Sequence, residues 1–280
     1  MNSIAVEVEI SIVSGSNGIP LSFFDPNHPF VNRPLPYREY ENKFYDQNTD
    51  VSLIIEEELT ITPPSLDLKK AFNCFNQIPS SGAKYTIKLC ADVPNNRRPL
   101  LLSANINSET GHTFLVVTKK NGAKTISQVF GFYAYKHPGY FFPFRSLPSV
   151  IKNNQLREIN ASIEMSLTES QFELLRKKAF ELAKQKYAAA SYNCTNYALD
   201  LFNAIRTSPI IIETCIVYLP ADVNIWGMTT GPERIIINKT PQMLFKKLKE
   251  MKDIKNSEAP YITVDTTENT KAPLSHGECN

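Results

Sequence analysis

The chain has 280 residues, of which 42% are apolar and 21% charged, and its 30 basic and 28 acidic residues leave a formal net charge of +2. This is the composition of an ordinary globular protein, long enough to bury a sizeable core in one large domain or two small ones. The near balance of charge argues against a nucleic-acid partner, which usually requires a clustered basic face. No apolar run reaches the ~20 residues of a membrane-spanning helix, so no transmembrane segment is expected.

Residues 1–65 are predicted to form a separate β-rich or extended section. Segments 4–13 and 51–61 have strand character, and the stretch between them is rich in proline, asparagine and aromatic residues. This section is a candidate surface for a protein partner. The first ten residues have no basic start and no signal-peptide core, so we expect a protein that is cytoplasmic as encoded or exported without a cleaved signal peptide.

Residues 66–255 carry a mixed α and β pattern and are predicted to form the main domain. Helices are expected over 68–75, from 169 to about 189 behind a Thr168-x-x-Gln171 capping box, and over 242–254. Strands are expected over 83–92 and 158–166, and Asn121-Gly122 predicts a hairpin between 112–118 and 125–133. The aromatic- and proline-rich stretch 134–150 is either one wall of a substrate cleft or a hydrophobic cover over the sheet. Irregular structure is expected over 210–237, and a tail over 256–280.

Cys194 is the strongest candidate for a catalytic residue. Asn193 is a good helix N-cap, and Cys194, Ala198 and Leu201 then follow one face of a helix. Free N–H groups and the helix dipole at that position favour a thiolate, so a lowered thiol pKa is expected. The same end of the helix can hold an oxyanion, and Asn193 and Thr195 are assigned to these capping and oxyanion roles.

A thiolate needs a base, and His112 is the best of the four histidines. It stands at the start of an apolar, β-branched segment that is predicted to be a strand. A histidine there, facing the N-terminus of a packed helix, would form a Cys–His pair with Cys194. The hairpin places a residue near 131 opposite His112, yet an orienting amide is still expected from this second strand, with Gln128 as the first choice.

The other cysteines and histidines point to no metal or cofactor. The five cysteines are an odd number without a close pair, which argues against a metal knuckle and a full disulfide framework. One bridge among Cys74, Cys90, Cys215 and Cys279 stays open. His276 and Cys279 offer two ligands, fewer than zinc requires, so a docked tail or a Cys279 disulfide is the preferred interpretation.

Two motifs together resemble a known fold. Gly111-His112-Thr113 on a strand, followed much later by Asn193-Cys194-Thr195-Asn196-Tyr197-Ala198 at a helix start, resembles the circularly permuted papain-like fold. The segment 193–197 is similar to the Asn-Cys-x-x-Phe segment of the lecithin:retinol acyltransferase-like proteins, which belong to this group with the permuted NlpC/P60 proteins. Over roughly residues 70–280 the chain most resembles uncharacterised Bacteroidetes-type bacterial proteins. The acyltransferase-like proteins carry a second histidine soon after the first, whereas here none occurs before His137.

The resemblance implies an α+β fold in which an antiparallel sheet packs against helices, and a thiol-dependent hydrolase. The expected substrate is an amide bond in a peptide or in peptidoglycan, as for a thiol protease or amidase, and a secreted antibacterial effector would fit a cell-wall substrate. Two alternatives stay open. One is a thiol acyltransferase or lipid esterase on the same fold. The other is a non-catalytic binding module, in which Cys194 and His112 are buried structural residues.

Overall fold

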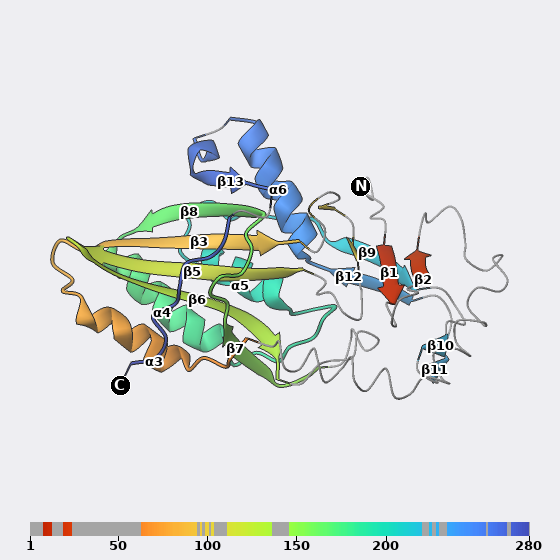
Figure 1. The fold of residues 1–280 in the computed structure, drawn as a ribbon, viewed down its shortest axis with the longest axis horizontal. Helices are drawn as coiled ribbons and strands as arrows, with labels where there is room; N and C mark the ends of the chain where they lie inside the picture. Colours follow the sequence, from red (N-terminus) through yellow and green to blue (C-terminus); the bar gives the residue numbers. More distant parts are fainter. Residues whose placement is uncertain are drawn as a thin grey trace.

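The protein is described by a computed structural model. It covers residues 63–93, 96, 99–100, 111–135, 146–214, 239–255, 257–267 and 270–279, together with the backbone of short strands elsewhere. The described part is an α+β structure with a six-stranded antiparallel open sheet and four α-helices (Figure 1). The predicted fold class is therefore confirmed at this level.

The sheet is built around two long neighbouring strands that form the predicted hairpin. Gly122 and Ala123 connect these strands, since Asn121 still pairs with Lys124, and Gly122 has the positive φ of 58° that such a turn requires. The turn thus lies one residue later than predicted. The strand order across the sheet is β13 (Ile262–Val264), β8 (Ala161–Leu167), β3 (Lys84–Asp92), β5 (His112–Asn121), β6 (Lys124–Ala134) and β7 (Ser149–Asn153).

The four helices begin at the residues that the capping signals indicate. Their bounds are α3 (Leu68–Asn73), α4 (Glu169–Leu182), α5 (Cys194–Asn203) and α6 (Pro241–Asp253). The side chains of Asp67, Thr168 and Thr240 accept hydrogen bonds from N–H groups in the first turns of α3, α4 and α6. A short 3₁₀ helix, η2 (Cys74–Gln77), follows α3 directly, and η3 (Ala259–Tyr261) precedes β13.

Helix α4 ends earlier than its sequence pattern predicts, at Leu182 rather than near residue 189. The hydroxyl of Ser149 donates to the carbonyls of Ala183 and Gln185, and Tyr187 pairs with Leu147 in an isolated bridge. These contacts with the segment that leads into β7 draw the chain out of the helix.

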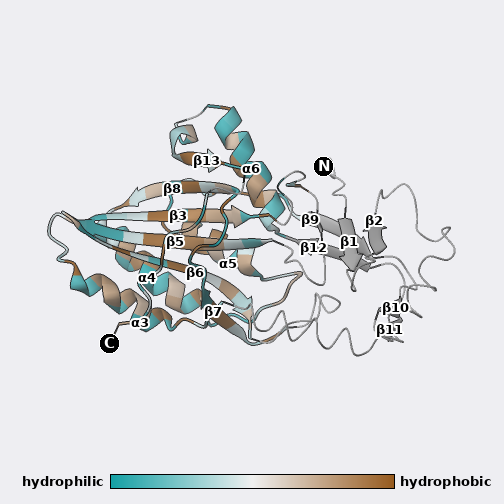
Figure 2. Cartoon of the chain, viewed as in Figure 1, coloured by the Kyte–Doolittle hydropathy of each residue, from teal (hydrophilic) through white to brown (hydrophobic). Residues whose placement is uncertain are grey.

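The two faces of the sheet are covered differently. Helices α4 and α5 lie behind the sheet in Figure 1, and the C-terminal tail crosses in front of it. In β5, Leu115 and Val117 belong to the large core under the helices, whereas Phe114 and Val116 belong to a smaller cluster that includes Ala272 of the tail. Apolar stretches run along the central strands in Figure 2. Because strand side chains alternate, His112 shares the tail face with Phe114, and Thr113 shares the helix face.

The tail predicted over 256–280 is only partly a docked tail, because Ile262–Val264 form β13, an edge strand of the main sheet paired with β8. Residues 270–279 do lie along the sheet as a docked tail, and they also protect a sheet edge. The N–H of His276 donates to the Ser127 carbonyl over 2.8 Å, and the N–H of Val129 donates to the Ser275 hydroxyl. This part of the β6 edge lies beyond the last residue that β7 covers, so the tail occupies hydrogen-bonding positions that would otherwise be exposed. A disulfide between Cys74 and Cys279 then joins the tail to η2.

The prediction of irregular structure over 210–237 is wrong for four short segments. Strand β9 (Cys215–Leu219) pairs with β12 (Arg234–Asn238), and β10 (Asn224–Ile225) pairs with β11 (Met228–Thr229), all antiparallel. Strands β9 and β12 are rich in isoleucine and valine, and such β-branched residues favour strand structure.

Near the N-terminus, β1 (Val8–Ile12) pairs with β2 (Ile19–Phe23) and, in parallel, with β4 (Leu102–Ser103). The predicted strand over 4–13 therefore contains β1. The strand predicted over 51–61 and most of the stretch 134–145 lie outside the described residues, and the proposed domain boundaries at 65 and 255 stay predictions.

Among the described residues, no helix has both the length and the apolar character needed to cross a membrane.

Candidate functional site

Cys194 is the first residue of α5, and a reciprocal cap holds it there. The Asn193 side chain accepts from the N–H of Thr195 over 2.8 Å and of Asn196 over 3.3 Å, and Asn196 Oδ1 accepts from the Asn193 N–H. The predicted Asn193 cap is confirmed, and Asn196 completes a capping box. The Asn193 amide also donates to the carbonyl of Lys239, which ties the start of α5 to the residue before the α6 cap.

The starts of α5 and β5 meet through their second residues. Thr113 Oγ1 and Thr195 Oγ1 lie 2.9 Å apart, and both side chains are fully buried. The Thr113 N–H also points to the Cys194 sulfur. The structure therefore brings the nucleophile candidate Cys194 beside the backbone that carries the base candidate His112. In the described structure no hydrogen bond joins the Cys194 thiol to the His112 imidazole.

The His112 imidazole lies across β6. It is 5% exposed and stacks on Tyr133, with ring centroids 4.3 Å apart. A Cβ added to Gly131 would lie 2.3 Å from His112 Nε2 and 2.4 Å from Asn154 Oδ1, so these two atoms converge on the same point above the glycine. Among the residues that the structure describes, neither atom has a hydrogen-bond partner. Asn154 is therefore the amide side chain that lies beside the His112 imidazole.

Gln128 does not hold that position, which corrects the sequence prediction. It pairs with Val117 in the β5–β6 ladder and is fully buried on the helix face of the sheet, whereas His112 lies on the tail face. The Gln128 Nε2 donates to the carbonyls of Ala71 and Gly277, and its Oε1 accepts from the Ser275 hydroxyl. Gln128 therefore anchors the tail and α3 to the sheet.

The sequence does not predict Asn154 as a site residue. Asn154 follows β7, and the aromatic- and proline-rich sequence of residues 134–150 does not indicate a strand there. Strand β7 begins opposite Ala134, at the end of the sheet where His112 lies, and runs back along β6 to Phe130, so that the Asn154 N–H donates to the Val129 carbonyl. The chain order alone offered a signal for Asn154. A third antiparallel strand after the hairpin would pack beside the second strand, and the residues that follow it would then lie next to the hairpin.

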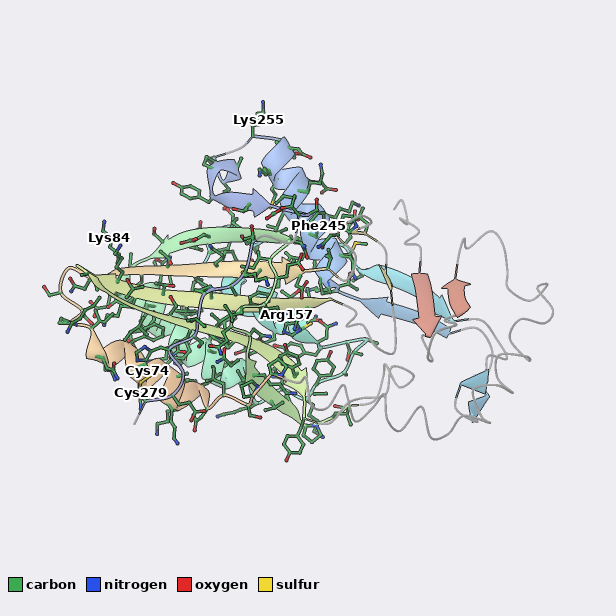
Figure 3. All side chains as sticks on the ribbon, in the orientation of Figure 1. Cys74, Lys84, Arg157, Phe245, Lys255 and Cys279 are labelled. Atoms are coloured by element: carbon green, nitrogen blue, oxygen red, sulfur yellow. A yellow bond between two sulfur atoms is a disulfide. The ribbon has the colours of Figure 1, made fainter. Side chains whose placement is uncertain are left out.

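A partly buried ion pair completes the polar cluster at this end of the sheet, and its arginine, Arg157, is labelled in Figure 3. Asp92 is the ladder partner of His112, and Arg157 Nε donates to its Oδ2 over 2.7 Å. Arg157 Nη1 and Asn154 Nδ2 both donate to the Tyr133 hydroxyl. Burial raises the pKa of Asp92 to about 6, against the opposing effect of Arg157. Partly buried charged groups and a buried amide thus gather around His112, as is common in functional sites.

Burial favours the neutral forms of both the Cys194 thiol and the His112 imidazole. Burial raises the pKa of Cys194, opposed by hydrogen bonds from the Thr113 N–H and Thr195 and by the charge of Arg157. Burial lowers the pKa of His112 to about 3, and Lys152 adds to that effect. The expected lowering of the Cys194 pKa is therefore wrong for this structure, because desolvation by burial outweighs the hydrogen bonds and the charge of Arg157 that lower the pKa.

The donors available for an oxyanion are fewer than expected. The Thr195 N–H is bound by the Asn193 cap, and the Thr195 hydroxyl is paired with Thr113. Among the described residues, no acceptor takes the N–H of Cys194 itself. Thr195 thus positions the helix, and the Cys194 N–H is the donor that the first turn leaves for a developing negative charge.

No metal-ligand cluster includes Cys194 or His112 in the part of the chain that the structure describes; the group found there consists of Cys74, His276 and Cys279. Comparisons of the chain with protein-family models, with curated proteins and with solved structures find no match.

Proposed function

We propose that the protein is a cysteine-dependent hydrolase of amide bonds on a permuted papain-like fold. Cys194 is the nucleophile, His112 the base, and Asn154 the residue that orients the imidazole. The observation that carries this proposal is the convergence of His112 Nε2 and Asn154 Oδ1, both buried and unpartnered, at the sheet end that receives the start of α5. Cysteine, histidine and asparagine are the three residue types that papain-like proteases use for this chemistry.

In the proposed reaction, Asn154 holds the proton of His112 on Nε2 and leaves Nδ1 free to accept the thiol proton. The Cys194 sulfur attacks the amide carbonyl while His112 takes that proton, and the N–H of Cys194 donates to the oxyanion. The protonated His112 then gives its proton to the leaving amine, and water hydrolyses the thioester. Because the raised Cys194 pKa and the lowered His112 pKa oppose ionisation before substrate binds, proton transfer accompanies the attack.

A peptide or peptidoglycan amide is the proposed substrate class, and a cell-wall substrate would place the protein outside the cytoplasm. The Cys74–Cys279 disulfide supports that location, since disulfides persist mainly in oxidising compartments.

The first test is the alkylation of native protein by iodoacetamide, with the modified cysteines identified by mass spectrometry. Cys194 should react, and His112→Ala should slow its alkylation by at least ~100-fold, the lower end of what a general base contributes. Asn154→Ala should slow it by less, because the imidazole remains but loses its orientation. Cys90 is the internal control, since it is a fully buried free thiol in the cluster between sheet and tail and should stay unmodified in every variant.

Equal alkylation of Cys194 in the wild type and His112→Ala would contradict the proposal, as would an inert Cys194. If the first test succeeds, peptidoglycan fragments and peptide libraries follow, with Cys194→Ala as the inactive reference. A product that has gained one water at an amide bond supports hydrolysis. Transfer of an acyl group to another acceptor would instead identify an acyltransferase.

A further inference from the structure

The docked tail brings a second set of reactive side chains together, far from Cys194. The sulfurs of Cys74 and Cys279 and a ring nitrogen of His276 all lie within 4.8 Å of one another. In Figure 3 the two sulfurs lie beside α3, and Arg157 of the polar cluster lies well away from them. The sequence alone offered two ligands at positions 276 and 279, and the fold adds Cys74 from a segment separated from Cys279 by 205 residues.

Contacts other than the disulfide hold these three residues in place. The His276 N–H donates to a β6 carbonyl over 2.8 Å, and the Cys279 N–H donates to the Lys70 carbonyl over 3.2 Å. Between them, the Gly277 carbonyl accepts from Gln128 Nε2 over 2.9 Å. Gly277 lies between His276 and Cys279 and has a φ of 85°, a left-handed conformation that glycine adopts readily. Reduction of the disulfide would therefore leave both thiols and the imidazole close together.

We propose that the reduced protein binds one Zn²⁺ through Cys74 Sγ, Cys279 Sγ and a ring nitrogen of His276. Two thiolates and one imidazole are ligands that zinc prefers, and water would fill the fourth tetrahedral position. The disulfide is first reduced to two thiols, either by a dithiol, which becomes a disulfide, or by a phosphine, which becomes the phosphine oxide with the oxygen of one water molecule while the two protons of that water go to the thiols. Zinc binding then releases those two protons as the thiols become thiolates.

The disulfide and the zinc site would be two alternative fastenings for the same tail. In an oxidising compartment Cys74 and Cys279 bond to each other, and in a reducing compartment the metal bridges them. In both states the tail keeps its place over the sheet edge beside Ser127 and Val129. The zinc proposal is independent of the proposed hydrolase function, since it uses neither Cys194 nor His112.

The test uses Co²⁺ as a spectroscopic substitute for Zn²⁺. The full chain is reduced with a phosphine, freed of reductant under anaerobic conditions and titrated with Co²⁺, and thiolate-to-cobalt charge-transfer absorption is recorded. We expect saturation at one metal per chain and loss of the band when Zn²⁺ is added. His276→Ala should weaken the affinity by at least ~tenfold, since even outer-shell groups of metal sites contribute that much. Leu274→Ala, an exposed neighbour in the tail, is the matched control and should bind like the wild type.

Two further variants and the oxidised protein test which residues bind the metal. Cys279→Ser should abolish the charge-transfer band, whereas Cys194→Ala should leave it unchanged. The oxidised protein should show no band until a reductant is added. The proposal is overturned by the absence of a band in the reduced wild type, by equal affinity in His276→Ala, or by a band that disappears in Cys194→Ala instead of Cys279→Ser.

Discussion

Gly131 is the residue on which the arrangement of His112 and Asn154 depends. It is buried in β6, and the histidine ring and the asparagine amide occupy the space where any other residue would carry its Cβ. The glycine is required here for lack of space and not for its backbone conformation, because its φ is not among the positive values in the chain. This separates its role from that of the turn glycines.

Gly131→Ala should disturb the site more than the small size of the added methyl group suggests. The new methyl group would lie 2.3 Å from His112 Nε2, so the imidazole must move, and overpacking of this kind costs ~1–3 kcal/mol of stability. We expect the alkylation rate of Cys194 to fall as in Asn154→Ala. Urea unfolding and alkylation, measured on the same samples, test both effects.

Gly82→Ala is the matched control. Its Cβ meets nothing within 4 Å, but its φ of 75° makes the substitution strained, at a cost of ~1–2 kcal/mol. The control should thus lose stability and retain the Cys194 reactivity. If Gly131→Ala also retained that reactivity, the convergence of His112 and Asn154 would have no bearing on the thiol.

At the scale of elements, α5 and β5 are joined by one buried pair of hydroxyl groups. Thr113 and Thr195 each follow one residue of the proposed catalytic pair in the chain, and their hydroxyl groups form a hydrogen bond with each other. Helix α5 is further fixed by Tyr197, which is fully buried and stacks on Phe132 of β6 with ring centroids 4.9 Å apart. The position of Cys194 is therefore set by contacts on the helix face of the sheet, whereas His112 is set by contacts on the opposite face.

A double-mutant cycle on this pair tests the junction. Thr113→Val or Thr195→Val alone leaves one buried hydroxyl without a partner, which should cost ~1–3 kcal/mol of unfolding free energy. The double variant removes both hydroxyls and should cost less than the sum, with a coupling of ~0.5–3 kcal/mol. Urea unfolding of the four proteins measures this coupling.

Thr118 and Ser127 provide the control, since their hydroxyls are also 2.9 Å apart but only partly buried. Water can replace either partner there, so Thr118→Val and Ser127→Ala should show weaker coupling. Additive losses for the Thr113–Thr195 pair would show that this hydrogen bond does not hold α5 on β5.

At the scale of the whole molecule, the Cys74–Cys279 disulfide links residues near the two ends of the described core. The chain between them forms all six strands of the main sheet and helices α4, α5 and α6. Such a long closed loop restricts the unfolded chain strongly, and the tail that it fastens covers one face of the sheet as well as an edge.

Cys279→Ser should lower the free energy of unfolding by ~2–5 kcal/mol, the usual loss when a native disulfide is removed. The measurement is urea unfolding with a metal chelator present, with and without a phosphine reductant. The reductant should destabilise the wild type to about the level of the variant and leave the variant unchanged. A reductant effect of equal size on both proteins would mean that another bridge, or no bridge, carries the stability.

Local signals in the sequence were sufficient for the elements whose ends are determined by side chains close by in the chain. The Asn193, Thr168 and Thr240 caps, strand β3 and the β5–β6 hairpin could all be predicted, because a cap or a turn is decided by side chains a few positions away. The same signals placed Cys194 on the first turn of a helix and His112 at the start of a strand.

Only the tertiary structure decided the contacts between residues far apart in the chain. It placed Asn154 rather than Gln128 beside His112. Gln128 pairs with Val117, and because side chains alternate along a strand, Gln128 lies on the opposite face of the sheet from His112. It also paired Cys74 with Cys279 and raised the Cys194 pKa through burial. Register, long-range pairing and desolvation depend on which segments pack together, and no short stretch of this sequence contains that information.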